Sequence, residues 1–292
     1  MNKQRWLCIV FSLIIFGGAF PDYWGQAESP LPPIDSQSLT TGLESTESLI
    51  VSGKGKVYFT YERKDFPTVE DFGFDGQKTA FNFHVGILKD RRVLFDGENE
   101  LMIHNDPNSE TPKLYLHPRK TTLLHEDPRN WGLQVYDIPL SQYLQENGMK
   151  ILGSGVLGKL PCYIVESKRN GGPITFWITP ERGFRCVQIQ YDSMWYKIPN
   201  DPAPWPTVTT ERIEYKAYQI DNQEVWFPAK GSMKTHRKSD SQFLSDLNME
   251  VKDFQLNVDV SDIFQVQIEP ETKVWVKKIE EFVPFKEIDW KP

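Results

Sequence analysis

The sequence lacks the patterns by which most catalytic and metal sites are recognised. It has no Gly-x-Ser-x-Gly, and Ser154 stands in the wrong frame for a nucleophile elbow. Gly153 to Gly158 matches Gly-x-Gly-x-x-Gly, but Pro161 and a β-branched run follow it where a dinucleotide site needs a helix. The histidines show no His-x-x-x-His spacing, and proline turns account for His104-Asn-Asp106 and His125-Glu-Asp127. We therefore expect no enzymatic activity, no cofactor and no metal.

Positive charge and glycosylation acceptors are also scarce. Lysine and arginine number 33 against 40 aspartate and glutamate, which gives a formal net charge of -7. This balance disfavours a nucleic-acid partner and a general attraction to anionic lipid. No Asn-x-Ser/Thr occurs in the 292 residues, which fits a bacterial exported protein better than a glycosylated eukaryotic one.

The N-terminus has the pattern of an export signal. Basic residues in Met1–Arg5 precede an apolar run, Trp6–Phe20, and small residues at Gly25 and Ala27 suit cleavage before Glu28. The alternative is an uncleaved anchor helix, but glycine, proline and aspartate interrupt the run before it could span a bilayer. We expect residues 1–27 to be removed and the mature protein to be periplasmic or otherwise exported. Residues 28–48 would be a disordered or short-helix lead-in, and residues 49–292 a single β-domain.

The clearest secondary-structure signal is the stretch Lys159–Tyr191, which predicts three consecutive strands. Turn residues separate the strands at Arg169–Pro173 and Thr179–Gly183. In the third strand Val187, Ile189 and Tyr191 alternate with polar residues. Strands joined by such short turns are antiparallel neighbours, so the stretch forms a meander with one dry face.

Two cysteines remain after the signal segment, Cys162 and Cys186. An exported protein could pair them in a disulfide. In the meander, however, their strands flank a common middle strand, which puts them roughly 9–10 Å apart. A disulfide needs Cα atoms within about 7 Å, so we expect both thiols to be free.

Most of the remaining chain also predicts strands, with little helix. A short helix is expected at Pro139–Gly148, with Leu140, Tyr143 and Leu144 as its apolar stripe, and a weaker one at Leu39–Leu49. Regularly spaced short strands with turn residues between them indicate a β-rich α+β fold built on one strongly curved antiparallel sheet. The expected strands are Leu49–Tyr61, Thr79–Ile87, Arg92–Gly97, Glu100–His104, Lys113–His117, Glu211–Ile220, Trp226–Lys234, Leu247–Val258 and Lys273–Val276.

Several local motifs, in this order and spacing, resemble the LolA-like superfamily of bacterial outer-membrane lipoprotein-sorting proteins. The motifs are Gly153 with Gly158–Val165, Phe176–Gly183, Val225–Pro228, and Phe254–Asn257 with Val260–Phe264. None of them is catalytic. The resemblance implies an antiparallel half-barrel, closed on one side by short helices, whose apolar cavity holds acyl chains. The chain is longer than LolA and has fewer helices that could act as lids.

The candidate ligand-binding residues are the apolar positions that would share the inner face of this sheet. Core packing explains any one of them alone, but scarce helical cover would leave room for a guest such as an acyl chain. We therefore hypothesise a monomeric carrier or sensor for lipid or lipoprotein acyl chains. The alternative is a structural module with a filled core that binds another envelope protein through a sheet edge or the proline-rich loop near Trp205. The expected lining residues are Phe59, Tyr61, Phe81, Phe83, Phe176, Ile178, Val187 and Ile189.

Overall fold

The computed structural model describes residues 30–61, 68–85, 89–105, 109, 111–118, 126–169, 172–195 and 205–290. The expected signal segment and most of the proline-rich loop lie outside these residues. None of the described helices is long and apolar enough to cross a bilayer.

One 15-stranded sheet dominates the described chain, in the order β17-β16-β6-β5-β4-β3-β2-β1-β15-β14-β13-β12-β11-β10-β9. All neighbours are antiparallel except β16 and β6, which are parallel. The strands are β1 Ser52–Tyr61, β2 Thr68–Asp75, β3 Lys78–Val85, β4 Arg91–Phe95, β5 Glu100–His104, β6 Lys113–His117, β9 Met149–Leu157, β10 Leu160–Arg169, β11 Gly172–Thr179, β12 Arg185–Trp195, β13 Trp205–Ile220, β14 Gln223–Arg237, β15 Phe243–Leu256, β16 Lys273–Val276 and β17 Glu281–Pro284.

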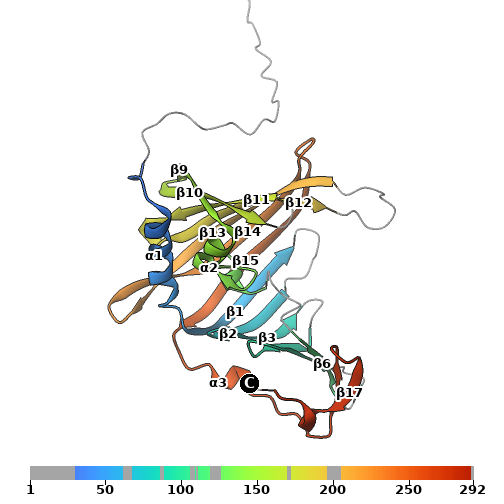
Figure 1. Ribbon diagram of the computed structural model, residues 1–292. Helices are drawn as coiled ribbons and strands as arrows, with labels where there is room; N and C mark the ends of the chain where they lie inside the picture. The colour runs from blue at the N-terminus through green and yellow to red at the C-terminus, as the bar shows by residue number, and fades with distance from the viewer. Residues whose placement is uncertain are drawn as a thin grey trace, which may run out of the picture.

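The sheet is open and strongly curved (Figure 1), which confirms the expected fold class. Strands β9 to β12 form one wing, β1 to β6 form the other, and the long strands β13 to β15 connect them. These connecting strands are 16, 15 and 14 residues long. Asp221 and Asn222, both at positive φ, make the two-residue turn between β13 and β14, where a primed turn matches the twist of the strands.

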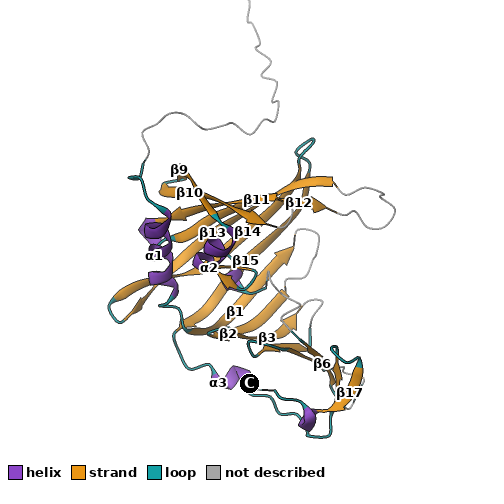
Figure 2. Cartoon of the chain, viewed as in Figure 1, coloured by secondary structure: helices purple, strands orange, loops and turns teal. Residues whose placement is uncertain are grey.

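Two helices lie on the concave side of the sheet (Figure 2). Helix α1, Ser36–Glu47, begins at Asp35, whose side chain accepts a hydrogen bond from the backbone N–H of Ser38 at 2.7 Å. It buries Leu39 and Leu43, so the region expected as a lead-in contributes to the core. Helix α2, Leu140–Asn147, buries Leu140, Tyr143 and Leu144, which confirms the apolar stripe expected there.

The C-terminal residues 257–290 cover the outer face of the β1–β6 wing. Helix α3, Ser261–Phe264, packs there, and the side chain of Ile263 occupies the space that a Cβ at Gly73 would need. A second apolar cluster forms beneath this segment, separate from the concave core, and contains Ala80, Leu94, Leu101, Ile103, Leu114, Val260, Phe264 and Val274. Both faces of this wing are therefore covered by the chain itself.

Asn257 holds the start of the C-terminal segment in place. Its side-chain oxygen accepts hydrogen bonds from the N–H groups of Val51 at 2.9 Å and Ser52 at 3.3 Å, and its amide nitrogen donates to the Leu49 carbonyl at 2.7 Å. Its backbone φ is 54°, a left-handed conformation that asparagine tolerates better than alanine.

We expect Asn257→Ala to lower the free energy of unfolding by about 2 kcal/mol, because it loses these bonds and strains the backbone. Urea denaturation measures this. Asn248→Ala, at an exposed position in β15, is the matched control and should change stability by less than about 0.5 kcal/mol. Equal losses in both variants would contradict the role given to Asn257.

Candidate functional site on the concave face

The structure gathers the predicted lining residues into one core. Seven of them are at most 3 % exposed and belong to the same apolar cluster, while Tyr61 is half-buried against it. Phe59, Phe81 and Phe83 come from the β1–β6 wing, and the rings of Phe81 and Phe83 stack with centroids 6.2 Å apart. The opposite wing contributes Phe176, Ile178, Val187 and Ile189. That these residues bind a ligand stays a prediction.

Residues 126–147, here called the cover segment, fill the concavity between the two wings. The segment contains a 3-10 turn, Pro128–Asn130, a small hairpin of β7 Gln134–Val135 and β8 Ile138–Pro139, and helix α2. Sequence patterns had indicated only the helix, and hence a sparsely covered trough. The irregular half supplies the missing cover, because it adds Trp131, Leu133 and Val135 to the core beside the helical residues.

The two halves of the cover segment are held differently. In the helical half, Ser141 donates hydrogen bonds from its N–H and hydroxyl to the Glu47 carboxylate of α1, and the Tyr143 hydroxyl donates to the Lys168 carbonyl at 2.7 Å. The first half, residues 128–139, is here called the cover hairpin. Its Trp131 ring lies against Gly231, where a Cβ would come within 2.1 Å of the ring. Packing against a bare glycine therefore positions the indole.

A buried acidic group lies where the cover segment begins. Glu70 of β2 is fully buried, and neither of its carboxylate oxygens has a hydrogen-bond partner. Burial raises its pKa well above the usual value, and the nearby Glu126 and Asp127 raise it further. Asp127 forms an ion pair with Arg129 at 2.9 Å.

No group of three or more His, Cys, Asp or Glu side chains in the described ranges could hold a metal ion.

A cavity of about 80 Å³ remains between the cover hairpin and the sheet. Ile189, one of the predicted residues, borders it, together with Gln134, Arg169, Tyr191 and Glu211. The Tyr191 hydroxyl donates a hydrogen bond to Glu211 Oε1 at 2.9 Å, and the Arg169 guanidinium lies 3.9 Å from the centre of the Tyr191 ring. A polar cluster thus interrupts the apolar concave face.

Burial dominates the electrostatics of this cluster. It raises the pKa of Glu211 to about 7, although the hydrogen bond from Tyr191 and the charge of Arg169 act in the opposite direction. The pKa of the Tyr191 hydroxyl is raised too, first by burial and then by Glu211. Near neutral pH the Glu211 carboxyl is therefore divided between its protonated and ionised forms.

Sequence reasoning missed this polar cluster, although a signal for Glu211 was present. Glu211 alternates in step with Ile213 and Tyr215 along β13, and all three are buried on the same face. A charged residue at an inward position of a strand is rarely fully buried without a partner or a function. Arg169 gives no such signal, because it ends β10 beside a turn.

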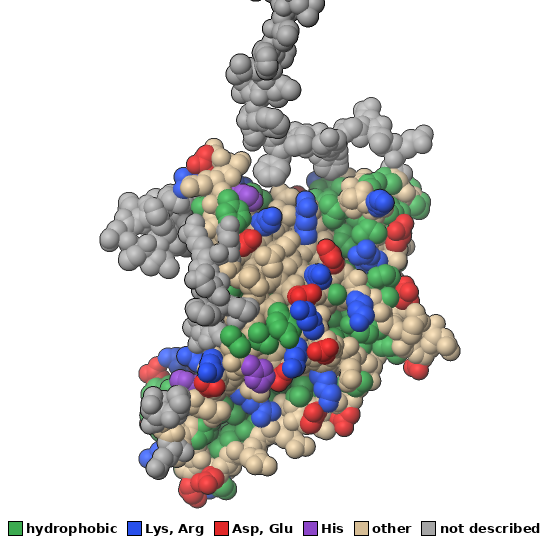
Figure 3. Space-filling model, turned by 180° about the vertical axis from the view of Figure 1, so that it is seen from behind, with side chains coloured by type: hydrophobic (Ala, Val, Ile, Leu, Met, Phe, Trp, Pro, Cys, Tyr) green, Lys and Arg blue, Asp and Glu red, His purple; other side chains and the backbone are tan. Residues whose placement is uncertain are grey.

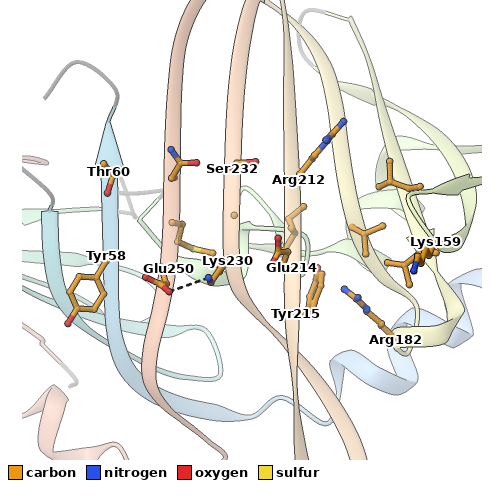
Figure 4. Close-up of a pocket in the computed structure, with 17 residues that line it drawn as sticks. Tyr58, Thr60, Lys159, Arg182, Arg212, Glu214, Tyr215, Lys230, Ser232 and Glu250 are labelled. Atoms are coloured by element: carbon orange, nitrogen blue, oxygen red, sulfur yellow. Dashed lines mark ion pairs between the residues drawn. The ribbon is translucent and has the colours of Figure 1, made fainter. Parts of the chain in front are cut away.

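The outer face of the sheet carries a different hollow. From behind, acidic and basic side chains are interspersed over this face (Figure 3). A shallow trough of about 880 Å³ crosses β1, β13, β14 and β15. Figure 4 shows its charged side chains, among them Arg182, Arg212 and Glu214, with an ion pair between Lys230 and Glu250 at 3.5 Å. Val187 also borders it. This polar surface does not suit an acyl chain.

The cysteines and the central meander are as expected. Strands β10, β11 and β12 are consecutive antiparallel neighbours. Cys162 and Cys186 lie on the two outer strands of this group, and both thiols are buried and free. Burial raises the pKa of the Cys162 thiol to about 11, so the thiolate that would be needed for exchange is disfavoured.

An open, curved antiparallel sheet with short helices on its concave face defines the structural class of this chain. No protein-family model and no curated protein matches the sequence. Among solved structures, the chain is similar to a LolA superfamily protein from Nitrosomonas europaea, with 15% identity and a TM-score of 0.45, over 80% of this chain and 99% of that one. A DUF1329 family protein from Desulfovibrio piger is similar too, with 11% identity and a TM-score of 0.46, over 79% of this chain and 95% of that one.

The lipoprotein LppX from Mycobacterium tuberculosis is also similar, with 9% identity and a TM-score of 0.30, over 77% of this chain and 100% of that one. These three similarities, each with a TM-score below 0.5, agree with the LolA-like resemblance inferred from the sequence and show nothing of function.

Proposed function

We propose that this protein is a non-enzymatic carrier or sensor, exported from the cytoplasm, that holds the acyl chain of a lipid or lipidated protein against its concave face. One observation supports this most directly. The apolar residues of the two wings are covered by the cover segment, whose elements are a 3-10 turn, a small two-stranded hairpin and one short helix. An apolar chain could take the place of part of that cover without disturbing the strands.

The free energies favour displacement of the cover hairpin alone. Burial of an acyl chain stabilises by about 0.8 kcal/mol per methylene, or about 12 kcal/mol for a 16-carbon chain. Exposing Trp131, Leu133 and Val135 costs about 1.5–3 kcal/mol each, or roughly 5–9 kcal/mol together. Moving helix α2 as well would expose three more buried apolar side chains and break its bonds to Glu47 and Lys168. One chain offsets the first cost but not both, so we expect α2 to stay in place.

The alternative function is a structural or interaction module of the cell envelope with a filled core and no lipid cargo. The size of the concave cavity favours it, since about 80 Å³ lies well below the roughly 300–1,000 Å³ of most ligand pockets. Under this alternative the cover segment never moves, and partners bind elsewhere on the protein.

Lipid analysis of the protein purified from its own envelope compartment separates the two functions. Native mass spectrometry should show an adduct that organic extraction removes and identifies as an acyl lipid. The delipidated protein should take up oleate-based lipids from micelles with a stoichiometry of one. If the purified protein carries no bound lipid and takes up none of these lipids, it is a structural module and not a carrier.

Ile189→Phe tests the concave face as the binding site. The larger side chain projects into the cavity beside Glu211, so we expect lipid retention to fall at least tenfold while the protein stays folded. Val156→Phe is the matched control, because Val156 is 60% exposed on the edge strand β9. Circular dichroism checks folding and native mass spectrometry gives the occupancy. Retention that is equal in both variants would place the ligand elsewhere.

A further inference from the structure

The cavity beneath the cover hairpin contains unsatisfied hydrogen-bonding capacity. The side-chain oxygen of Gln134 is buried and has no hydrogen-bond partner. It belongs to β7 of the cover hairpin and borders the cavity opposite Glu211 and Arg169, which come from β13 and the end of β10. A buried amide oxygen without a partner is costly, so its presence at a cavity wall points to a donor that enters from the cavity.

The charges around the cavity balance one another. Arg169 supplies one cation, and Glu211 supplies one carboxyl group that titrates near neutrality. With Glu211 ionised and balanced by Arg169, an additional full charge in this half-enclosed cavity would be left uncompensated and would be expensive to bury. The polar group that enters should therefore be uncharged. It needs a hydroxyl to donate to Gln134 or Glu211 and an oxygen to accept from Arg169.

The cavity has the size of a small polar fragment. At about 10–15 Å³ for each water-sized position, a volume of 80 Å³ corresponds to on the order of five to eight non-hydrogen atoms. That is the size of a glycerol unit with its ester. Because the cover hairpin forms one wall, a shift of the hairpin away from the strands would join the cavity to the apolar surface that it covers, and the ligand would then lie between Gln134 and the sheet.

We propose that this cavity is the polar subsite of the ligand site and binds the uncharged, hydroxyl-bearing glyceryl ester end of an acyl lipid. The inference rests on the proposed acyl-binding function and adds the chemical class of the ligand. Gln134, Glu211 and Arg169 contact the glyceryl ester, while Ile189 and its apolar neighbours contact the first part of the acyl chain.

Three probes with the same oleoyl chain test this. They are monooleoylglycerol, methyl oleate, which lacks hydroxyls, and oleate, which is anionic. Binding to the delipidated full-length mature protein is measured by displacement of a fluorescent fatty acid. We expect monooleoylglycerol to bind about tenfold more tightly than methyl oleate, which corresponds to ~1.4 kcal/mol. Oleate should bind more weakly than monooleoylglycerol.

Two variants complete the test. Gln134→Leu keeps the approximate size of the side chain but removes the acceptor, so it should weaken the binding of monooleoylglycerol and erase its tenfold preference over methyl oleate. Gln190→Leu, at an exposed position on the opposite face of β12, should keep the preference. Equal binding of all three probes by the wild type would overturn the polar subsite but leave acyl binding standing. If oleate bound most tightly of the three probes, the cavity would be an anion site instead. If the protein bound none of the three probes, the proposed function itself would be overturned.

Discussion

Trp131→Ala is expected to destabilise the protein and at the same time increase its uptake of lipid. The indole is 2 % exposed and lies against Gly231 beneath the concave surface. Its removal loses a large buried side chain and leaves a cavity, so the free energy of unfolding should fall by about 3–5 kcal/mol. The cavity would open on the side where the cover hairpin meets the connecting strands.

The increase in uptake follows from the same change. If an acyl chain must displace the cover hairpin, removal of the largest side chain of the hairpin lowers the cost of displacement by roughly 2–3 kcal/mol. The affinity for methyl oleate should then rise by about 30- to 150-fold. In a protein whose core is permanently filled, the same substitution would only destabilise.

Trp275→Ala is the matched control. Trp275 is half-buried in β16, far from the concave core, and the centroids of its ring and the Phe282 ring are 5.0 Å apart. We expect a stability loss of about 1–2 kcal/mol and no change in lipid affinity. Urea denaturation and the displacement assay give the two quantities. A large loss of stability in Trp131→Ala without any gain in affinity would contradict displacement of the hairpin.

Strongly periodic elements of this chain could be predicted from the sequence because their local pattern and tertiary role agree. Strands β5, β6 and β16 have the expected bounds, and α2 buries the expected stripe. In β5 and α2 the buried apolar residues occur at the period of the element, and in β6 and β16 one buried apolar residue is followed two positions later by a half-buried one. Propensity and packing therefore favour the same structure.

Elements whose inward residues are polar or small were missed. In β2, Glu70 and Asp71 hide the alternation of Phe72 and Phe74, because acidic residues are depleted in strands. Strand β9 contains two glycines and has few buried residues, so its place in the sheet depends on pairing with β10. Its position at the edge explains how so weak a pattern is tolerated.

The cover hairpin was missed for a different reason. Its strands have two residues each, and Tyr136 and Asp137 adopt positive φ at the turn without a glycine. Long-range packing of Trp131 on Gly231 stabilises this conformation, and no local pattern reports a contact between residues that far apart. The residues that the sheet contributes to the candidate site could therefore be predicted from the sequence, but those that the cover hairpin contributes could not.

The stability of the protein is expected to fall as the pH rises from about 4.5 to about 7, and Glu211 is one identifiable cause. Burial raises the pKa of Glu211 to about 7 in the folded protein, against 4.5 for an ordinary glutamate in the unfolded chain. Between these values the folded state keeps a proton that the unfolded state has lost. The contribution of Glu211 is therefore fully present below about pH 4.5 and is lost as the pH passes through 7, to the extent of about 3 kcal/mol.

Glu211→Gln isolates this contribution, because the neutral amide can still accept the hydrogen bond from Tyr191. Urea unfolding at intervals between pH 4.5 and 7.5 should show a shallower decline for the variant, which should be more stable than the wild type at the upper end. Glu70 and Glu47 contribute to the residual slope, because burial raises the pKa of each and so acts in the same direction. Glu214→Gln removes an exposed carboxylate three positions along the same strand and should reproduce the wild-type profile. A Glu211→Gln profile parallel to that of the wild type would mean that the carboxyl is ionised inside the fold throughout this range, and that burial does not raise its pKa.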